Sequence, residues 1–411
     1  MFLTTGQATA SRSVIDFVRQ VGGVDVVSGR KPGRSCGVYT GPRRGFSRAS
    51  LTTSAGCGGD RSSRSCGSWL ALLLRGQGVT APPTPGRAAA RTVAQAGGRG
   101  SSYVEGRREV GSCEWRSGSD ERQHVRVTST VITLADGRRL SWHEFGDPDG
   151  SPVVYTAGTP VSGLGGACYD QPARAAGLRW ICPDKPGYGA SDFHRHRSLA
   201  SWGDDLAILV AHLRLDRFAL AGESGGAPFT LAAAHRFADR VNVIALIAAG
   251  GPMGRAERAG MMASARVLNW LARNAPALNT FRIAAMRRSL ASPQRRRRLL
   301  DREMAATPDA AHADALRIEL EAVADALRQG SRAAVQELAL IKRPWTFPLS
   351  EVSTPVHLWH GARDRNAPIA YAHQLARQLP DATLHVSDTL GHDVGLHRRD
   401  EVMSVLAAGM K

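Results

Sequence analysis

From about Val125 onward, short apolar runs with strand character alternate along the chain with longer segments of helical periodicity. We expect strands at Val127–Thr133, Leu140–Phe145, Val153–Ala157, Arg179–Pro183, Arg217–Gly222, Val243–Ala249, Pro355–His360 and Thr383–Ser387. Helical patterns lie between them, for example at Trp202–Leu213, Ala227–Phe237 and Ala370–Leu379. This alternation predicts a doubly wound, mostly parallel α/β sheet covered by helices on both faces.

A long helical stretch interrupts the alternation at about residues 254–348. Ser292-Pro293 and Thr307-Pro308 have the order of an N-cap followed by a proline at the first helical position. A glycine that fits a helix stop, Gly330, follows an apolar helix face made by Leu316, Leu320, Val323 and Leu327. We therefore expect an all-helical insertion between the strand Val243–Ala249 and the last two strands.

Residues 1–124 have a different character, being rich in Arg, Gly and Ser and poor in periodic apolar residues. Such a composition buries too little apolar surface to offset the entropy of ordering the chain, so we expect a low-complexity, disordered basic extension. A second hypothesis is that this stretch is not native and that translation starts from a non-ATG codon at Val125 or Val127. The N-terminal mass of the natively expressed protein tests it. The folded domain is then 125–411.

The formal charge of +17 suggests a nucleic-acid partner, but its distribution argues against one. Residues 1–125 carry 18 basic and 8 acidic side chains, and the remaining 286 residues carry 35 and 28. The six cysteines form no C-x-x-C pair, so neither a disulfide framework nor a zinc site is indicated. No apolar run reaches the roughly 18 residues of a membrane span, and a signal-like run at Trp69–Leu74 lies far from Met1. We expect a cytoplasmic protein.

The strongest chemical signal is the sequence Gly222-Glu-Ser224-Gly-Gly226. It is a G-x-S-x-G motif that follows an apolar strand and precedes a helical run, which is the context in which this motif presents a nucleophilic serine on a sharp turn. The backbone N–H of Gly225 would then face a developing oxyanion. An ordinary glycine-rich turn between a strand and a helix is the structural alternative.

A serine nucleophile needs a base, and the base needs a group that orients it. Asp364 follows the strand Pro355–His360 through a glycine turn, and His392 follows the next strand. We predict that Asp364 is the acid and His392 the base. Asp388 and Asp393 are weaker candidates for the acid because neither follows a strand through a glycine turn. The histidines inside strands are expected to be packing groups: His357, His360 and His385.

A second oxyanion donor should come from the loop after the strand Val153–Ala157. The backbone N–H of Thr159 is our candidate, with Gly158 allowing a close approach. Further along, Asp184 and Asp192 bracket a Pro/Gly-rich loop, which we expect them to order through backbone hydrogen bonds.

Taken in order, five segments resemble the α/β-hydrolase superfamily, in particular its capped serine hydrolases: Gly158–Pro160, Asp184–Asp192, the Ser224 turn, His360–Asp364 and Gly391-His392. The resemblance runs from about Val125 to the C-terminus. It implies that residues 254–348 form a helical cap over the active site. One departure is Ala157, where relatives commonly carry a histidine. Serine at the turn argues against the epoxide hydrolases and haloalkane dehalogenases, which carry aspartate there.

The resemblance implies cleavage of a carboxylic ester, or a related acyl bond, of a small molecule through an acyl-enzyme, without a metal or organic cofactor. Three alternatives keep the fold: an aminopeptidase or carbon–carbon bond hydrolase, an acyltransferase, and a catalytically silent binding protein. A peptidase would be favoured by acidic cap residues that bind a substrate amine, with Glu319, Glu321 and Glu337 as candidates. A nucleic-acid-binding protein would rest on the basic extension alone.

Overall fold

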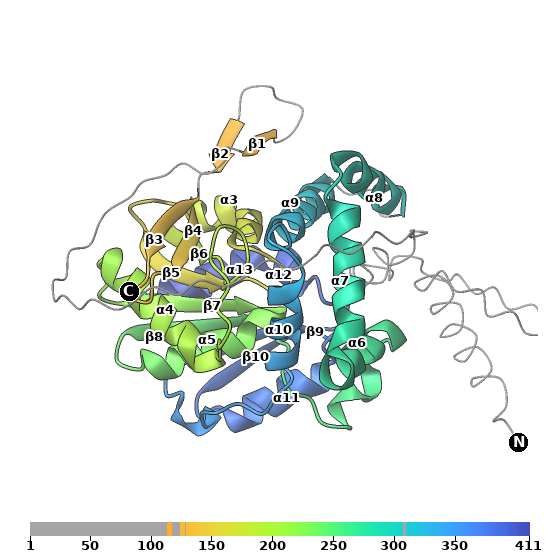
Figure 1. The fold of residues 1–411 in the computed structure, drawn as a ribbon. Coiled ribbons are helices and arrows are strands. Elements are labelled where there is room, and N and C mark those ends of the chain that lie inside the picture. Colours follow the sequence, from red (N-terminus) through yellow and green to blue (C-terminus); the bar gives the residue numbers. More distant parts are fainter. Residues whose placement is uncertain (1–112, 117–123, 128, 307–309) are drawn as a thin grey trace, which may run out of the picture.

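The protein, as a computed structural model, is described for residues 113–116, 124–127, 129–306 and 310–411. Most of the expected basic extension and the Thr307-Pro308 pair therefore lie outside the described residues. Within the described ranges a central sheet is flanked by helices, as Figure 1 shows. No helix in these ranges is both long enough and apolar enough to cross a membrane.

Eight strands form the central sheet in the order β10-β9-β8-β7-β5-β6-β4-β3. The pairs β3–β4 and β4–β6 are antiparallel, and all other neighbours are parallel. Two further strands, β1 (Cys113–Arg116) and β2 (His124–Val127), form a separate antiparallel pair. The strands of the main sheet are β3 (Thr130–Thr133), β4 (Arg139–Gly146), β5 (Ser151–Thr156), β6 (Leu178–Pro183), β7 (Phe218–Glu223), β8 (Val241–Ile247), β9 (Val356–Gly361) and β10 (Ala382–Ser387).

The fold class expected from the sequence is confirmed, and seven of the expected strands end within two residues of the observed ones. The first expected strand, Val127–Thr133, is wrong in its extent. Its beginning belongs to β2 and its end to β3, which pair with different partners.

Helices cover both faces of the sheet and fill the interval between β8 and β9. They are α3 (Asp170–Ala175), α4 (Leu199–His212), α5 (Ala227–Arg236), α6 (Ala263–Asn274), α7 (Pro276–Leu290), α8 (Pro293–Ala306), α9 (Ala310–Ala326), α10 (Arg332–Leu340), α11 (Ile369–Gln378), α12 (Val394–His397) and α13 (Arg399–Gly409). Short 3-10 helices are η1 (Gly163–Tyr169), η2 (Ser224–Gly226), η3 (Glu257–Gly260) and η4 (Leu349–Glu351).

Two apolar cores lie on opposite faces of the sheet because successive strand side chains point to opposite sides. In β7, Phe218 and Leu220 belong to the larger core, which α4, α5 and α11 cover. The intervening Ala219 and Ala221 belong to the smaller core, which α3 and α13 cover. A sheet buried on both faces holds its strand ends rigidly, which suits it to position reactive groups.

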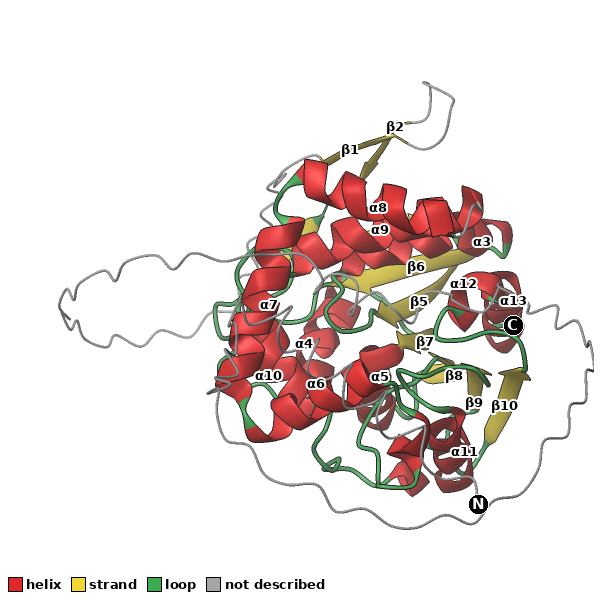
Figure 2. Ribbon diagram, turned by 90° about the vertical axis from the view of Figure 1, so that its right-hand side faces the viewer, coloured by secondary structure: helices red, strands yellow, loops and turns green. Residues whose placement is uncertain are grey.

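The five helices α6 to α10 lie together on one flank of the sheet in Figure 1, and Figure 2 shows them from that flank. Helix α9 packs against η1, which follows β5, and α10 packs against α6 and α7. The apolar face expected before Gly330 is buried: Leu316, Leu320, Val323 and Leu327. These helices therefore stand beside the segments that follow β5 and β7.

Candidate active site

Ser224 lies on a strained turn between β7 and α5. Its φ of 49° is in the left-handed region, which a non-glycine residue adopts only when the surrounding structure imposes it. A Cβ on Gly222 would lie 2.1 Å from Thr230 Oγ1, and one on Gly226 would lie 2.1 Å from the Thr156 carbonyl oxygen. Both glycines are therefore required for strand and helix to pass this closely, and the turn leaves the Ser224 hydroxyl facing a cavity.

The structure brings His392 and Asp364 to Ser224 in a linear arrangement. His392 Nε2 lies 3.0 Å from Ser224 Oγ, and His392 Nδ1 lies 2.7 Å from Asp364 Oδ2. The backbone N–H groups of Asn366 and Ala367 donate to Asp364 Oδ1 at 2.8 and 3.0 Å, which fixes the carboxylate. An ionised Asp364 favours the imidazole tautomer with the proton on Nδ1, and Nε2 is then free to accept the serine proton.

The electrostatics of this array follow from burial and from its neighbours. Burial opposes protonation of His392, but Asp364 outweighs it, and with Glu223 and Glu319 raises the pKa of the imidazole to about 9. Burial would raise the pKa of Asp364, yet His392 and His360 hold it below its usual value. The His360 imidazole lies 3.5 Å from Asp364 and also hydrogen-bonds to the Ala367 carbonyl oxygen at 2.6 Å.

The other aspartate and histidine candidates have different partners. Asp393 Oδ1 accepts the Gly391 N–H at 3.0 Å and Oδ2 lies 3.3 Å from His397, so this carboxylate orders the loop that carries His392. The imidazoles of His357 and His385 face each other, with Nδ1 and Nε2 3.1 Å apart.

The two predicted oxyanion residues lie next to each other beside Ser224. A Cβ on Gly225 would lie 2.3 Å from Thr159 Oγ1. The Gly225 N–H is in the first turn of a helix and has no intrahelical acceptor, and no acceptor for the Thr159 N–H occurs among the described residues. A Cβ on Gly158 would lie 3.4 Å from the Ser224 Cβ, an ordinary contact, and the expected role of Gly158 in a close approach to the Thr159 N–H stays a prediction.

A buried ionic cluster holds the loop that carries Thr159 in place. Lys185 Nζ donates to the carbonyl oxygens of Ala157 and Gly158 at 2.8 and 3.0 Å and pairs with Glu337 Oε1 at 2.6 Å. Glu337, on α10, also accepts the Thr159 hydroxyl and pairs with Arg197 at 2.7 Å. All three charged side chains are at most 1% exposed. The sequence named Glu337 only as one of three acids that might bind an amine.

Burial would raise the pKa of Glu337, but the two cations outweigh it and hold that pKa below its usual value. Burial lowers the pKa of Lys185, and Arg197 adds to this effect. Two cations face one carboxylate, so Glu337 remains ionised. Because this carboxylate belongs to α10, it connects the helices between β8 and β9 directly to the loop that carries Thr159.

A cavity of about 260 Å³ opens above Ser224, between the strand ends and helices α6, α7, α9 and α10. Met262 lines this cavity, whereas Trp270, on α6, is 59% exposed. Most of the wall is apolar, with Met253, Leu268, Met286, Leu316, Leu320, Val323, Leu338 and Ile341. Four charged residues besides His392 and Asp393 also line it: Glu223, Glu319, Arg282 and Lys342.

Glu223 and Glu319 lie near the His392 imidazole. The hydroxyls of Tyr155 and Tyr169 both donate to Glu223 Oε2, the second at 3.3 Å. Burial and the Glu223 charge raise the pKa of Glu319 to about 7, with His392 opposing them. Glu319 therefore exchanges its proton near neutral pH, and its charge acts on His392 mainly above that pH.

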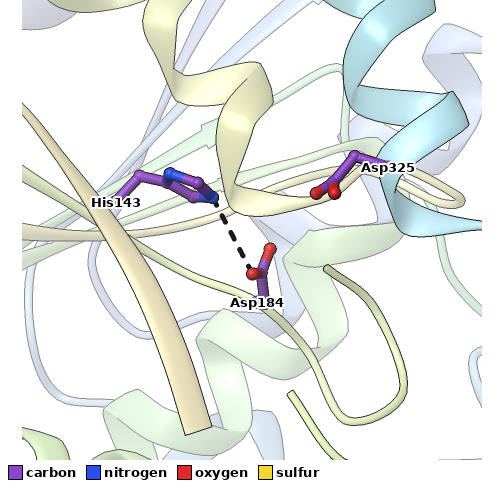
Figure 3. Close-up of side chains that lie close together, drawn as sticks. All are labelled: His143, Asp184 and Asp325. Atoms are coloured by element: carbon purple, nitrogen blue, oxygen red, sulfur yellow. Dashed lines mark ion pairs between the residues drawn. The ribbon is translucent and has the colours of Figure 1, made fainter. Parts of the chain in front are cut away.

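One group of side chains within the described ranges has the composition of a metal site: His143, Asp184 and Asp325, which Figure 3 shows. His143 Nε2 lies 3.8 Å from Asp184 Oδ2. Asp184 is already engaged, because its oxygens accept the Gly163 N–H at 2.8 Å and the Ser141 hydroxyl at 2.6 Å. Asp184 Oδ2 also accepts the Ala190 N–H at 3.4 Å, which is a backbone hydrogen bond to the loop that Asp184 was expected to order. These hydrogen bonds leave the carboxylate poorly disposed to a metal. That the protein needs no metal remains a prediction.

Comparisons with known proteins converge on one fold. A family model described as alpha/beta hydrolase fold matches residues 163–397. Among solved structures, the chain is similar to the esterase EaEST from Exiguobacterium antarcticum (TM-score 0.51, 17% identity, 68% of this chain and 98% of that one). It is also similar to the esterase RhEst1 from Rhodococcus sp. ECU1013 (TM-score 0.50, 18% identity, 69% and 99%).

Two curated relatives from Pseudomonas putida match shorter segments. One is the dihydrolipoyllysine-residue acetyltransferase component of an acetoin cleaving system, 35% identical over 120 residues. The other is 2-hydroxy-6-oxo-2,4-heptadienoate hydrolase, 31% identical over 122 residues. These matches cover 28% and 29% of this chain, and only 31% and 44% of the respective relatives.

Proposed function

The chain belongs to the alpha/beta hydrolase fold family, and on this basis we propose that it is a serine hydrolase that cleaves a carboxylic ester of a small molecule. The observation that carries the proposal is the array of Ser224, His392 and Asp364, with its two contacts of 3.0 and 2.7 Å at the floor of an apolar cavity. An apolar cavity with a few convergent polar groups suits a small organic substrate.

In the proposed reaction, His392 Nε2 takes the proton of Ser224 as the serine oxygen attacks the ester carbonyl. The N–H groups of Gly225 and Thr159 donate to the oxyanion that forms, and Asp364 stabilises the imidazolium. His392 then gives the proton to the departing alcohol, which leaves an acyl-enzyme. Water, deprotonated by His392, adds to the acyl carbonyl, and collapse of the second intermediate releases the acid and restores Ser224.

The test combines a fluorophosphonate probe with a panel of short- to long-chain para-nitrophenyl esters. We expect the probe to label Ser224, as read by peptide mass, and Ser224→Ala to lower kcat by at least about 10⁴-fold, since nucleophile removal leaves only binding and oxyanion stabilisation. Ser264→Ala is the matched control, because this serine lines the same cavity without a base beside it. A folded protein that neither reacts with the probe nor hydrolyses any ester would contradict the proposal and favour a binding role.

A second candidate is a carbon–carbon bond hydrolase on the same residues. The similarity to 2-hydroxy-6-oxo-2,4-heptadienoate hydrolase favours it, over 29% of this chain. Turnover of that dienoate, followed through the absorbance of its conjugated system and abolished by Ser224→Ala, would support this candidate. Ester hydrolysis without dienoate turnover would leave the esterase as the proposed activity.

A further inference from the structure

Arg282, on α7, is an unpaired cation in the wall of the cavity. It is 7% exposed, and among the described residues no carboxylate pairs with it. Its Nε donates to Asn279 Oδ1 at 3.3 Å, and the Asn279 Nδ2 donor is itself buried without an acceptor. Burying an unpaired charge is costly, so a fold that retains one without a counter-ion commonly uses it for a ligand.

Lys342, just after α10, is a second cation of the same wall. It is partly buried, and no acid pairs with it in the described part of the chain. Burial alone lowers the pKa of Lys342 to about 8 and that of Arg282 to about 10, so both side chains are charged at neutral pH. The charges of Glu223 and Glu319 do not raise the pKa of Arg282 or of Lys342. The acids beside His392 therefore do not neutralise the two cations.

The cavity is therefore polarised. Negative charge lies near the nucleophile, on Glu223 and Glu319, and positive charge lies on α7 and after α10. Most of the other residues of the wall are apolar, with Met286, Leu316 and Leu338 among them. A ligand with a carboxylate would be repelled at the nucleophile and attracted at Arg282, which orients the molecule along the cavity.

We infer that the substrate carries a carboxylate remote from the bond that is cleaved, and that Arg282 binds this carboxylate with Lys342 adding to the positive field. The planar guanidinium matches a carboxylate in a two-pronged hydrogen bond, and the apolar wall accommodates the spacer between the two ends. This inference rests on the proposed hydrolase function. It narrows the substrate class from esters in general to esters that retain one free acid group.

The kinetic test compares para-nitrophenyl hemiadipate and hemisuberate with their methyl-capped neutral counterparts, and repeats the comparison with esters of ω-hydroxy acids. We expect a higher kcat/KM for the anionic member of at least one series. Arg282→Met should lower that preference, measured as the ratio of kcat/KM for the anionic ester to kcat/KM for its neutral counterpart, by roughly 10- to 100-fold, as expected for a charge-assisted hydrogen bond. Lys342→Met should have a smaller effect in the same direction. Arg288→Met and Arg343→Met are controls, since Arg288 is exposed on the same helix as Arg282 and Arg343 is exposed next to Lys342.

Equal turnover of the anionic and neutral esters in the wild-type enzyme would overturn the inference while leaving the hydrolase proposal intact. Binding provides a second readout that does not depend on turnover. In Ser224→Ala, monomethyl suberate should raise Tm more than dimethyl suberate does, and the added Arg282→Met substitution should remove that difference. No difference between the two ligands would overturn the inference, even if the protein proved to have no esterase activity.

Loss of folding does not confound these tests. Arg282→Met replaces a buried, unpaired charge by an apolar chain of similar length, so Tm without ligand should stay the same or increase. A large decrease of Tm in this variant would show that Arg282 has a structural partner and would contradict its assignment to a ligand.

Discussion

The imidazole of His392 has unusually acidic surroundings for a group that accepts a proton in the proposed reaction. Asp364 contacts one ring nitrogen, and Glu223 and Glu319 act from the cavity, so the pKa of His392 rises to about 9. A general base functions only in its neutral form. The free enzyme should therefore gain activity as the pH rises toward that value, and substrate charge and burial will modify this limb once the cavity is filled.

Glu319 provides a way to test this account at a single residue. In Glu319→Gln one source of the raised His392 pKa is gone, so the acid limb of the kcat/KM profile should move to lower pH. At pH 8, where Glu319 is mostly ionised in the wild type, kcat/KM should rise by about two- to tenfold, because one pKa unit corresponds to a factor of ten. The measurement is the full pH profile with a neutral ester.

Glu321→Gln is the matched control for Glu319. This acid lies on the same helix but pairs with Arg296 at 2.7 Å, away from the cavity lining. The acid limb of the kcat/KM profile of Glu321→Gln should coincide with that of the wild type. An unshifted limb in Glu319→Gln would mean that the Glu319 charge does not reach His392 in the working enzyme.

The sequence predicted the residues that the structure brings together at the strand ends. Of those that the helices supply, it named Glu319 and Glu337 only as possible ligands of an amine and did not single out Arg282. Ser224, Asp364 and His392 could be found because each follows a strand, and parallel strands end at one edge of a sheet. Glu319, Arg282 and Glu337 belong to helices whose rotation about their axes depends on tertiary packing. Periodicity indicates which face of a helix is apolar, but not which polar residue beside that face meets the cavity.

At the scale of elements, α10 is attached to the sheet by a charge cluster as well as by apolar packing. Glu337 on this helix holds Lys185, Arg197 and the Thr159 hydroxyl at once. Through Lys185 the same cluster holds the carbonyl oxygens of Ala157 and Gly158, and the second of these belongs to the peptide that carries the Thr159 N–H. The position of the Thr159 N–H therefore depends on a helix that is remote from it in sequence.

Replacing Glu337 by glutamine should impair both stability and catalysis. Two buried cations lose their counter-charge, which costs about 3–5 kcal/mol, so Tm should fall. Assayed well below that Tm, kcat for a neutral ester should drop more than KM changes, because a displaced oxyanion donor affects the transition state more than the bound substrate. Glu351→Gln, which removes only an exposed ion pair with His235, is the control. A lower Tm with unchanged kcat would show that the cluster stabilises the fold without positioning Thr159.

Strand positions could be predicted well because buried strands of this sheet are short, continuous apolar runs. The exception, Val127–Thr133, shows what such a pattern lacks. Alternation continues through both β2 and β3, but it carries no information on which partner strand each half will pair with.

At the scale of the whole molecule, the sheet and the cavity are formed by the same part of the chain. Every strand of the eight-stranded sheet lies within residues 130–411, and every residue that lines the cavity lies within 155–396. Much of the basic excess lies outside this part, since residues 1–125 hold 18 basic against 8 acidic side chains. The division of the chain at about residue 125 remains a prediction.

Removal of residues 1–124 tests that division. The truncated protein loses β1, the partner of β2, but keeps the whole central sheet, so we expect kcat/KM for neutral esters to stay within about twofold and Tm to change little. The comparison is between purified full-length and truncated proteins in the same assay. A large loss of activity or of Tm would assign the first 124 residues a part in the folded enzyme.

The carboxylate of Glu337 also limits how this enzyme can be recombined with others. A helical segment transplanted from a related enzyme into the interval between β8 and β9 would have to provide an acid at the same point in space, or Lys185 and Arg197 would be left buried without a counter-charge. Exchange of the segment for a new specificity should therefore succeed only when the acid, or both cations, are exchanged with it. The helices that shape the cavity and the loop that carries Thr159 therefore have to be exchanged together.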